Sequence, residues 1–319
     1  MGNRVQDEMN KIEIPAELHE RSKRGVLQAK SEMRRSRPVI KRVGALAASV
    51  LILAGSYGLY QSFFQNKVEE AGQDQGNQIV QTEEGVYIPE IKLPEGGGAS
   101  MDMIGLIVYK GGIYIQTDTR VVPEHAKALV GEKLGKTKGS IDEWSSQDEY
   151  AVEFASSIGE IDVFKVKGYD SDFRIMAYDD RNGEPYAEFF ERLHGITVQS
   201  GADIFGKVQL VGNVVDAKYR TFSEWDNSID NYHPIESKDI VETFVEELNS
   251  TVPYTYEHVE ETLGDFRNNE EYREVSLTLK DGTVVSLALI KEGYIRYGFL
   301  GVYFKMDDDV FREMWNEIE

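Results

Sequence analysis

One stretch, Arg34–Phe64, constrains the chain more than any other feature of its 319 residues. Five basic side chains fall within residues 34–42, and the next 22 residues, 43–64, carry no charge. At a rise of about 1.5 Å per residue, a helix over residues 43–64 would be about 33 Å long, close to the hydrocarbon thickness of about 30 Å. The pattern therefore predicts a transmembrane helix over residues 43–64.

Two other interpretations fit the apolar stretch less well. A cleaved signal peptide has a short charged leader, whereas 42 residues precede this stretch. Its apolar region is also shorter than the uncharged run seen here. A buried core helix is normally apolar along one side, and residues 43–64 are apolar all round. A retained membrane anchor is the prediction that agrees with all three observations.

The orientation of this anchor follows from the basic residues beside it. On the far side, Lys67 is the only basic side chain before Lys92. The near side carries five basic residues that we assign to membrane topology: Arg34, Arg35, Arg37, Lys41 and Arg42. Because basic loops stay on the cytoplasmic side, we expect residues 1–42 in the cytoplasm and residues 65–319 outside the cell membrane.

The net charge divides at the same place. Residues 1–42 hold 11 basic and 6 acidic side chains, so the remainder of a chain with net charge −21 carries −26. A domain this acidic repels a phosphate backbone, and we expect no nucleic-acid partner for it. The basic tail could instead lie against anionic lipid.

Residues 12–36 predict a short amphipathic helix in the tail. Pro15 suits the first helical turn, and early glutamates with a late basic cluster suit the helix dipole. A narrow apolar face is the candidate partner-binding site: Ile14, Leu18, Val26, Ala29 and Met33. A helix this marginal gains order on contact with a partner. The alternative is a solvated basic tail at the lipid surface.

The order Ile14-Pro15, Glu17-Leu18, a helix with Gly25 and Ala29, a basic run and one span resembles the Bacillus-type membrane-anchored negative effectors of extracytoplasmic-function sigma factors. The resemblance covers about residues 1–65. It implies that the cytoplasmic segment holds a sigma factor and that the external domain senses a signal or gates proteolysis. The chain has no cysteine, so it lacks the zinc motif of another anti-sigma class.

Beyond the anchor, residues 65–100 have the low hydrophobicity and glycine content of a linker. The following segments predict strands and helices in turn. We expect hairpins over 104–117 and 273–297, strands over 161–169 and 173–190, a strand pair over 206–219, helices over 123–135 and 237–250, and a closing strand with a helix from Asp308.

Strands and helices without regular alternation predict an α+β fold with antiparallel hairpins, preceded by one transmembrane helix. Loop signals near residues 222–236 divide the external part into two subdomains, 101–225 and 235–319. The predicted organisation is thus a tail (1–42), an anchor (43–64), a linker (65–100) and these two subdomains.

No motif in the chain predicts catalysis, and we expect neither a metal nor a cofactor. The absence of cysteine excludes thiolate catalysis and cysteine-based metal sites, and the five histidines lack metal-binding spacing. Residues 131–137 resemble a phosphate loop but follow a predicted helix and have three residues between the glycines instead of four. The acidic clusters at 179–184 and 307–309 fit turns and helix caps better than calcium loops.

The sequence therefore predicts a non-enzymatic, single-pass membrane regulator that sequesters a sigma factor through its tail and senses or protects through its external domain. The alternative is a membrane-tethered external module that binds an envelope ligand or protein. Tyrosines and tryptophans exposed together would indicate such a contact surface.

Overall fold

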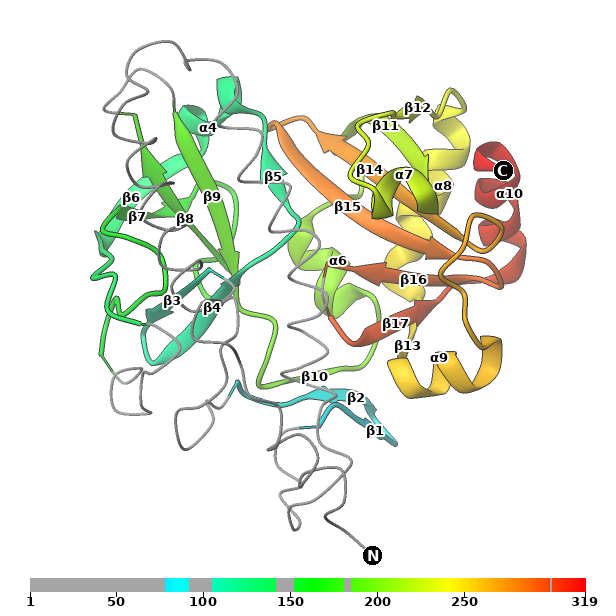
Figure 1. Cartoon of the computed structure of the whole chain (residues 1–319), viewed down its shortest axis with the longest axis horizontal. Coiled ribbons are helices and arrows are strands. Elements are labelled where there is room, and N and C mark those ends of the chain that lie inside the picture. The colour runs from blue at the N-terminus through cyan, green and yellow to red at the C-terminus, as the bar shows by residue number, and fades with distance from the viewer. Residues whose placement is uncertain (1–77, 92–104, 142–151, 181–184, 299) are drawn as a thin grey trace, which may run out of the picture. The chain divides into compact units, whose positions relative to one another are not determined.

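The structure is a computed structural model that describes residues 78–91, 105–141, 152–180, 185–298 and 300–319 (Figure 1). The tail, its ten assigned side chains and the predicted anchor lie outside the described residues. Within the described part, none of the helices combines the length and the apolar character that a bilayer crossing requires. The described residues belong to one compact unit and form a mixed α+β fold with antiparallel strand pairing, as predicted.

The first large sheet has six strands in the order β3-β4-β9-β8-β7-β6, and every neighbouring pair is antiparallel. Its strands are β3 (Leu106–Tyr109), β4 (Gly112–Gln116), β6 (Val130–Lys136), β7 (Asp162–Val166), β8 (Arg174–Asp179) and β9 (Tyr186–Glu191). The β3–β4 hairpin confirms the prediction for residues 104–117, and its turn places Lys110 and Gly111 at positive φ. Helix α4 (Pro123–Leu129) precedes β6.

The second large sheet has eight strands. Its path is β12-β11-β14-β15-β16-β17-β13, and β5 also pairs with β15. The strands are β5 (Arg120–Val121), β11 (Val214–Thr221), β12 (His233–Pro234), β13 (Val252–Thr255), β14 (Tyr272–Leu279), β15 (Thr283–Ile290), β16 (Tyr294–Tyr297) and β17 (Val302–Lys305). The predicted hairpin at Asp281-Gly282 is confirmed as β14–β15.

The main core lies on one face of the eight-stranded sheet. Alternate side chains of its strands, such as Leu277 and Leu287, are fully buried there, as the two-residue period of a strand requires. Three helices contribute apolar side chains to the same core: α6 (Ala202–Val208), α8 (Lys238–Glu247) and α10 (Asp308–Ile318). The 3₁₀ turn η1 (Leu248–Ser250) follows α8, and α10 begins at Asp308 as predicted.

Helices α7 (Phe222–Asp226) and α9 (Tyr256–Leu263) contribute instead to a smaller cluster. This cluster uses the outward side chains of the same strands, among them Tyr272, Ile290 and Tyr303. The eight-stranded sheet is therefore covered on both faces at this end.

The expectation that residues 65–100 form a linker is wrong for residues 80–88. These residues form the hairpin β1 (Val80–Thr82) and β2 (Gly85–Ile88), which pairs with β10 (Ile196–Val198) in a three-stranded sheet. Val86 and Ile88 are buried in the main core. Tertiary packing of these two side chains outweighs the polar composition around them.

Two element predictions are wrong. The helix expected over 123–135 ends at Leu129, and residues 130–136 form β6 because they pair with β7. Gly135 packs against Phe154, where a Cβ would approach the ring to 2.3 Å. The strand pair expected over 206–219 is instead the end of α6 followed by β11, since the core takes up Phe205 and Val208 from one helical face.

Strand β11 also bears on the subdomain boundary expected near residues 222–236. It pairs with β14 from Val214 to Thr221, with one irregularity at Val215, and α6 packs into the same core. Residues 202–221 thus belong structurally with the C-terminal sheet. The loop signals in the sequence mark only a local break after β11. Its partner β14 begins more than 50 residues further along the chain, so no local signal indicates that the two strands pair.

A buried ion pair within the six-stranded sheet is hydrogen-bonded to a side chain of the eight-stranded sheet. Arg174 and Glu191 are register partners on β8 and β9, with no exposed side-chain surface, and Arg174 Nη2 lies 2.6 Å from Glu191 Oε1. Tyr297, at the end of β16, donates to Glu191 Oε2 at 2.7 Å. The Tyr297 hydroxyl also lies 2.6 Å from Thr119 Oγ1 in the segment before β5. One carboxylate therefore holds groups from both sheets.

Aromatic rings enclose the Arg174 guanidinium, with Tyr169 at 4.3 Å and Phe189 at 4.9 Å from its central carbon to the ring centres. Burial by itself would lower the pKa of Arg174, but the charge of Glu191, the neighbouring Tyr297 and Tyr169, and the hydrogen bond to Glu191 together outweigh burial and raise that pKa. Burial, followed by the Glu191 charge, raises the pKa of Tyr297 well above its usual range. The arginine is therefore held as a cation and the tyrosine as a neutral donor.

Replacing Glu191 with Gln should cost about 3–5 kcal/mol of unfolding free energy, because it leaves the Arg174 charge buried without its partner. Urea unfolding of the full chain in detergent micelles measures the loss. The matched control is Glu160→Gln, which removes a carboxylate 2.5 Å from Lys136 on the exposed surface, where we expect a much smaller effect. Equal losses in the two variants would contradict the importance assigned to the buried pair.

Candidate functional site

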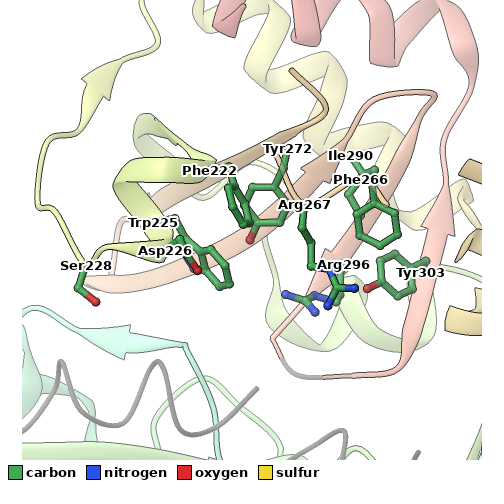
Figure 2. A pocket seen from close by; sticks show the side chains of 10 residues that line it. All are labelled: Phe222, Trp225, Asp226, Ser228, Phe266, Arg267, Tyr272, Ile290, Arg296 and Tyr303. Atoms are coloured by element: carbon green, nitrogen blue, oxygen red, sulfur yellow. The ribbon is translucent and has the colours of Figure 1, made fainter. Parts of the chain in front are cut away.

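A cavity lies on the outward face of the eight-stranded sheet (Figure 2). Its volume is about 270 Å³. It is lined by Phe222, Trp225, Asp226, Ser228, Phe266, Arg267, Tyr272, Ile290, Arg296 and Tyr303. We call this cavity the aromatic pocket.

Strand register builds the floor of the aromatic pocket. Arg296 on β16 faces Ala288 on one side and Tyr303 on the other, so these side chains share one sheet face. Tyr272 and Ile290 are register partners one row further along. Four neighbouring strands thus supply the floor, and the hydrogen-bonded ladders fix the spacing of its side chains.

Helix α7 forms one wall through Phe222 and Trp225. A capping box starts this short helix, because the Thr221 hydroxyl accepts from the Glu224 backbone and the Glu224 carboxylate accepts from the Thr221 backbone at 2.8 Å. Hydrogen bonds from Thr221 contribute to lowering the pKa of Glu224 to about 2, against the opposing effect of its burial. The cap holds Trp225 over the sheet.

The second wall is the segment between α9 and β14, which contributes Phe266 and Arg267. The Ser223 N–H at the start of α7 donates to Asn269 Oδ1 at 2.8 Å and so links the two walls. Arg273 donates in turn to the Asn269 carbonyl. These bonds tie the two walls of the pocket together.

Ring contacts complete the lining. Phe222 and Trp225 each pack on Tyr272, with centroid distances of 5.4 and 5.2 Å, and Phe266 packs on Tyr303 at 6.0 Å. Tyr272, Phe266 and Tyr303 are buried, whereas Phe222 and Trp225 remain partly exposed. Partly exposed aromatic side chains that gather in a concave site are typical of a binding surface.

Charged groups lie at the base of the aromatic pocket. In Figure 2 the side chains of Arg267 and Arg296 point toward the same part of the cavity, near the Tyr303 hydroxyl. Arg296 is 9% exposed, whereas the Arg267 side chain is 41% exposed and lies 3.5 Å from Asp265. Asp226 is the acidic lining residue, on the α7 side. The lining therefore carries one more positive than negative charge.

A titrating carboxyl lies near this charged base. Burial is the main cause that raises the pKa of Asp118 to about 7, and the Glu274 carboxylate adds to the rise. Three basic neighbours oppose it: Arg296, Arg120 and Arg220. Arg220 is itself paired with Glu274, its register partner on β14. The outward sheet face therefore continues from the aromatic pocket into a buried charge network.

The motifs weighed in the sequence have structural roles. Residues 131–136 lie in β6, so no phosphate loop forms there. Asp307 caps α10, while Asp308 and Asp309 pair with Lys305 and Arg312. Among the described residues no group of three or more potential metal ligands comes together.

The histidines and tryptophans are dispersed. Among the described histidines, His194 is buried against the Ile113 carbonyl, His233 lies 3.2 Å from Glu224, and His258 stacks on Tyr254. Trp225 lines the aromatic pocket and Trp315 packs on Phe311, while Trp144 lies outside the described residues.

The aromatic pocket was not predicted from the sequence, because the signals in residues 222–236 indicated a loop. Phe222, Trp225 and the capping pair Thr221–Glu224 are the signal that could have indicated a helix there.

Comparison with protein-family models, with curated proteins and with solved structures finds no match to this chain. The site is therefore defined by its geometry alone.

Asp118 should make the unfolding free energy depend on pH. Its pKa is raised on folding, so the folded chain keeps a proton between about pH 4 and 7 that the unfolded chain releases, and stability falls as pH rises through this range. We expect Asp118→Asn to remove a fall on the order of 1–2 kcal/mol, less than the full shift because Asp118 is partly exposed.

Urea unfolding of the full chain in micelles at a series of pH values measures this slope. Asp230→Asn changes the same charge on the exposed surface and should retain the wild-type slope. A slope that Asp118→Asn leaves unchanged would count against the assignment.

Proposed function

We propose that this chain is a single-pass membrane regulator whose cytoplasmic tail sequesters an extracytoplasmic-function sigma factor. The observation that carries the proposal is the charge pattern around Val43–Phe64, with five basic residues on one side and a strongly acidic remainder on the other. The proposed location is the cell membrane, with residues 1–42 in the cytoplasm and the α+β domain outside.

The proposed mechanism is sequestration by a helix. The apolar face formed by Ile14, Leu18, Val26, Ala29 and Met33 would bury against the sigma factor, and the basic neighbours would pair with acidic groups on it. The resemblance of residues 1–65 to membrane-anchored negative effectors supports this role. Basic residues 34–42 would at the same time contact anionic lipid headgroups.

The external domain is the proposed sensor, and the aromatic pocket is its ligand site. Support comes from the concave shape, the partly exposed Phe222 and Trp225, and two arginines at the base. No set of catalytic groups converges among the residues that line it, since the acidic member Asp226 is accompanied by arginines and aromatic side chains. Binding, not turnover, is therefore the activity we assign to it.

The same pocket also favours a second function. A membrane-tethered module that binds an envelope ligand would need the pocket and an anchor, but the tail would serve only for insertion. The two functions differ in their dependence on residues 1–42. Exchanging this segment for an unrelated basic leader should abolish the regulator and leave the tethered module active.

The topology can be tested by labelling, because the chain has no cysteine of its own. We expect Ser31→Cys to resist a membrane-impermeant maleimide in intact cells, and Glu124→Cys, on the exposed surface of α4, to react. Both should react after the membrane is permeabilised. Labelling of Ser31→Cys in intact cells would overturn the proposed orientation.

Sigma-factor binding can be tested by capturing the full chain from solubilised membranes. We expect a sigma factor, identified by mass spectrometry, to be retained by the wild type and lost from Leu18→Asp and Val26→Asp, because a carboxylate on the apolar face would be desolvated on binding. Ser31→Asp is the matched control, since it adds the same charge on the opposite side of the predicted helix.

Transcription from a promoter that depends on the retained sigma factor should rise in the two apolar-face variants and stay at the wild-type level in the control. Failure to retain any sigma factor, together with unchanged transcription on deletion of the tail, would leave the tethered module as the function of this chain.

A further inference from the structure

The charge at the base of the aromatic pocket selects the sign of its ligand. Arg296 rises from the sheet floor and Arg267 from the facing wall, and both point into the cavity (Figure 2). Asp226 is the acidic lining residue and is exposed at the α7 side. A ligand in the cavity therefore meets the guanidinium group of Arg296 on the floor and that of Arg267 on the wall, which also pairs with Asp265, a geometry that suits a carboxylate.

The walls select the body of the ligand. Phe222, Trp225 and Tyr272 form a contiguous set of rings, with centroid separations of 5.2–5.8 Å. Phe266 and Tyr303 form a second ring pair across the floor. A flat apolar group between these two sets would bury its faces against rings on both sides.

The size limits the ligand further. A volume of about 270 Å³ is just below the range of small-molecule sites, whose volumes are about 300–1,000 Å³. The walls are also held together, since Ser223 on α7 donates to Asn269 on the opposite segment. The aromatic pocket therefore suits a molecule with one or two rings and does not suit a long chain.

We infer that the aromatic pocket binds a small aromatic carboxylate, whose anionic group pairs with Arg267 and Arg296 and whose ring lies between Trp225 and Phe266. The inference rests on the proposed sensor role of the pocket and deepens it by naming the ligand class. A cationic ligand is the principal competitor, because aromatic rings also attract cations. The guanidinium groups of Arg296 on the floor and Arg267 on the wall oppose that choice, since like charges repel at close range.

Four probes test the inference against the full chain in lipid nanodiscs. Phenylacetate carries both the ring and the carboxylate, phenylacetamide and phenethylammonium replace the negative charge with a neutral and a positive group, and acetate lacks the ring. Titration calorimetry measures affinity, and tryptophan fluorescence reports on the pocket through Trp225. We expect phenylacetate to bind about tenfold or more tightly than each of the other three.

Variants locate the binding. Arg267→Gln should weaken phenylacetate binding about tenfold. Because the Arg267 side chain is exposed, this substitution should leave the protein folded. Arg296→Gln should weaken binding at least as much, with circular dichroism used to verify its fold. Trp225→Phe should keep calorimetric binding and lose most of the fluorescence response. Arg312→Gln on α10 is the matched control and should bind as the wild type does.

The inference is overturned if phenethylammonium or phenylacetamide binds as tightly as phenylacetate, if phenylacetate fails to bind at millimolar concentration, or if Arg267→Gln binds it unchanged. None of these outcomes affects sigma-factor capture by the tail, which is measured separately. Conversely, selective phenylacetate binding by a chain that captures no sigma factor would support the ligand class and overturn only the regulator.

Discussion

The buried carboxylate of Glu191 links the two large sheets. It is completely buried, pairs with Arg174 of the neighbouring strand, and accepts a hydrogen bond from Tyr297 of the other sheet. Burying a charge costs free energy unless the charge is paired and hydrogen-bonded. The backbone ladder fixes β8 against β9, and the hydrogen bond from Tyr297 to Glu191 adds a directional contact between this pair of strands and β16.

Strand β16 contributes both to the contact with Glu191 and to the aromatic pocket. Arg296 and Tyr297 are consecutive residues, so their side chains point to opposite faces of the sheet. Tyr297 reaches the buried ion pair, and Arg296 lines the pocket floor. Asp118 and Thr119, also consecutive, lie near the same two side chains from the segment before β5. The charged side chain that lines the pocket and the tyrosine that bonds to Glu191 are thus adjacent residues of one strand.

Local signals in the sequence predicted those elements whose residues interact with close neighbours along the chain. The turn at Asp281-Gly282 and the start of α10 at Asp308 follow from turn and capping chemistry. Helix α6 and the β1–β2 hairpin were missed, because Phe205 and Val86 gain their stability from a core assembled elsewhere. For the pocket, Trp225 was recognisable as an aromatic residue, but its place against Tyr272 was not.

By itself, the sequence determined the mixed α+β class, the absence of any disulfide or thiolate chemistry, and a charge pattern that predicts one anchor with the basic tail inside. Each of these depends on composition or on short-range order. Only the tertiary structure decided that Arg174, Glu191, Tyr297 and Thr119 meet, and that Arg267 and Arg296 converge beneath two sets of rings. Thr119 and Tyr297 are 178 positions apart along the chain. Contacts over such separations arise from strand register and core packing, which no local pattern encodes.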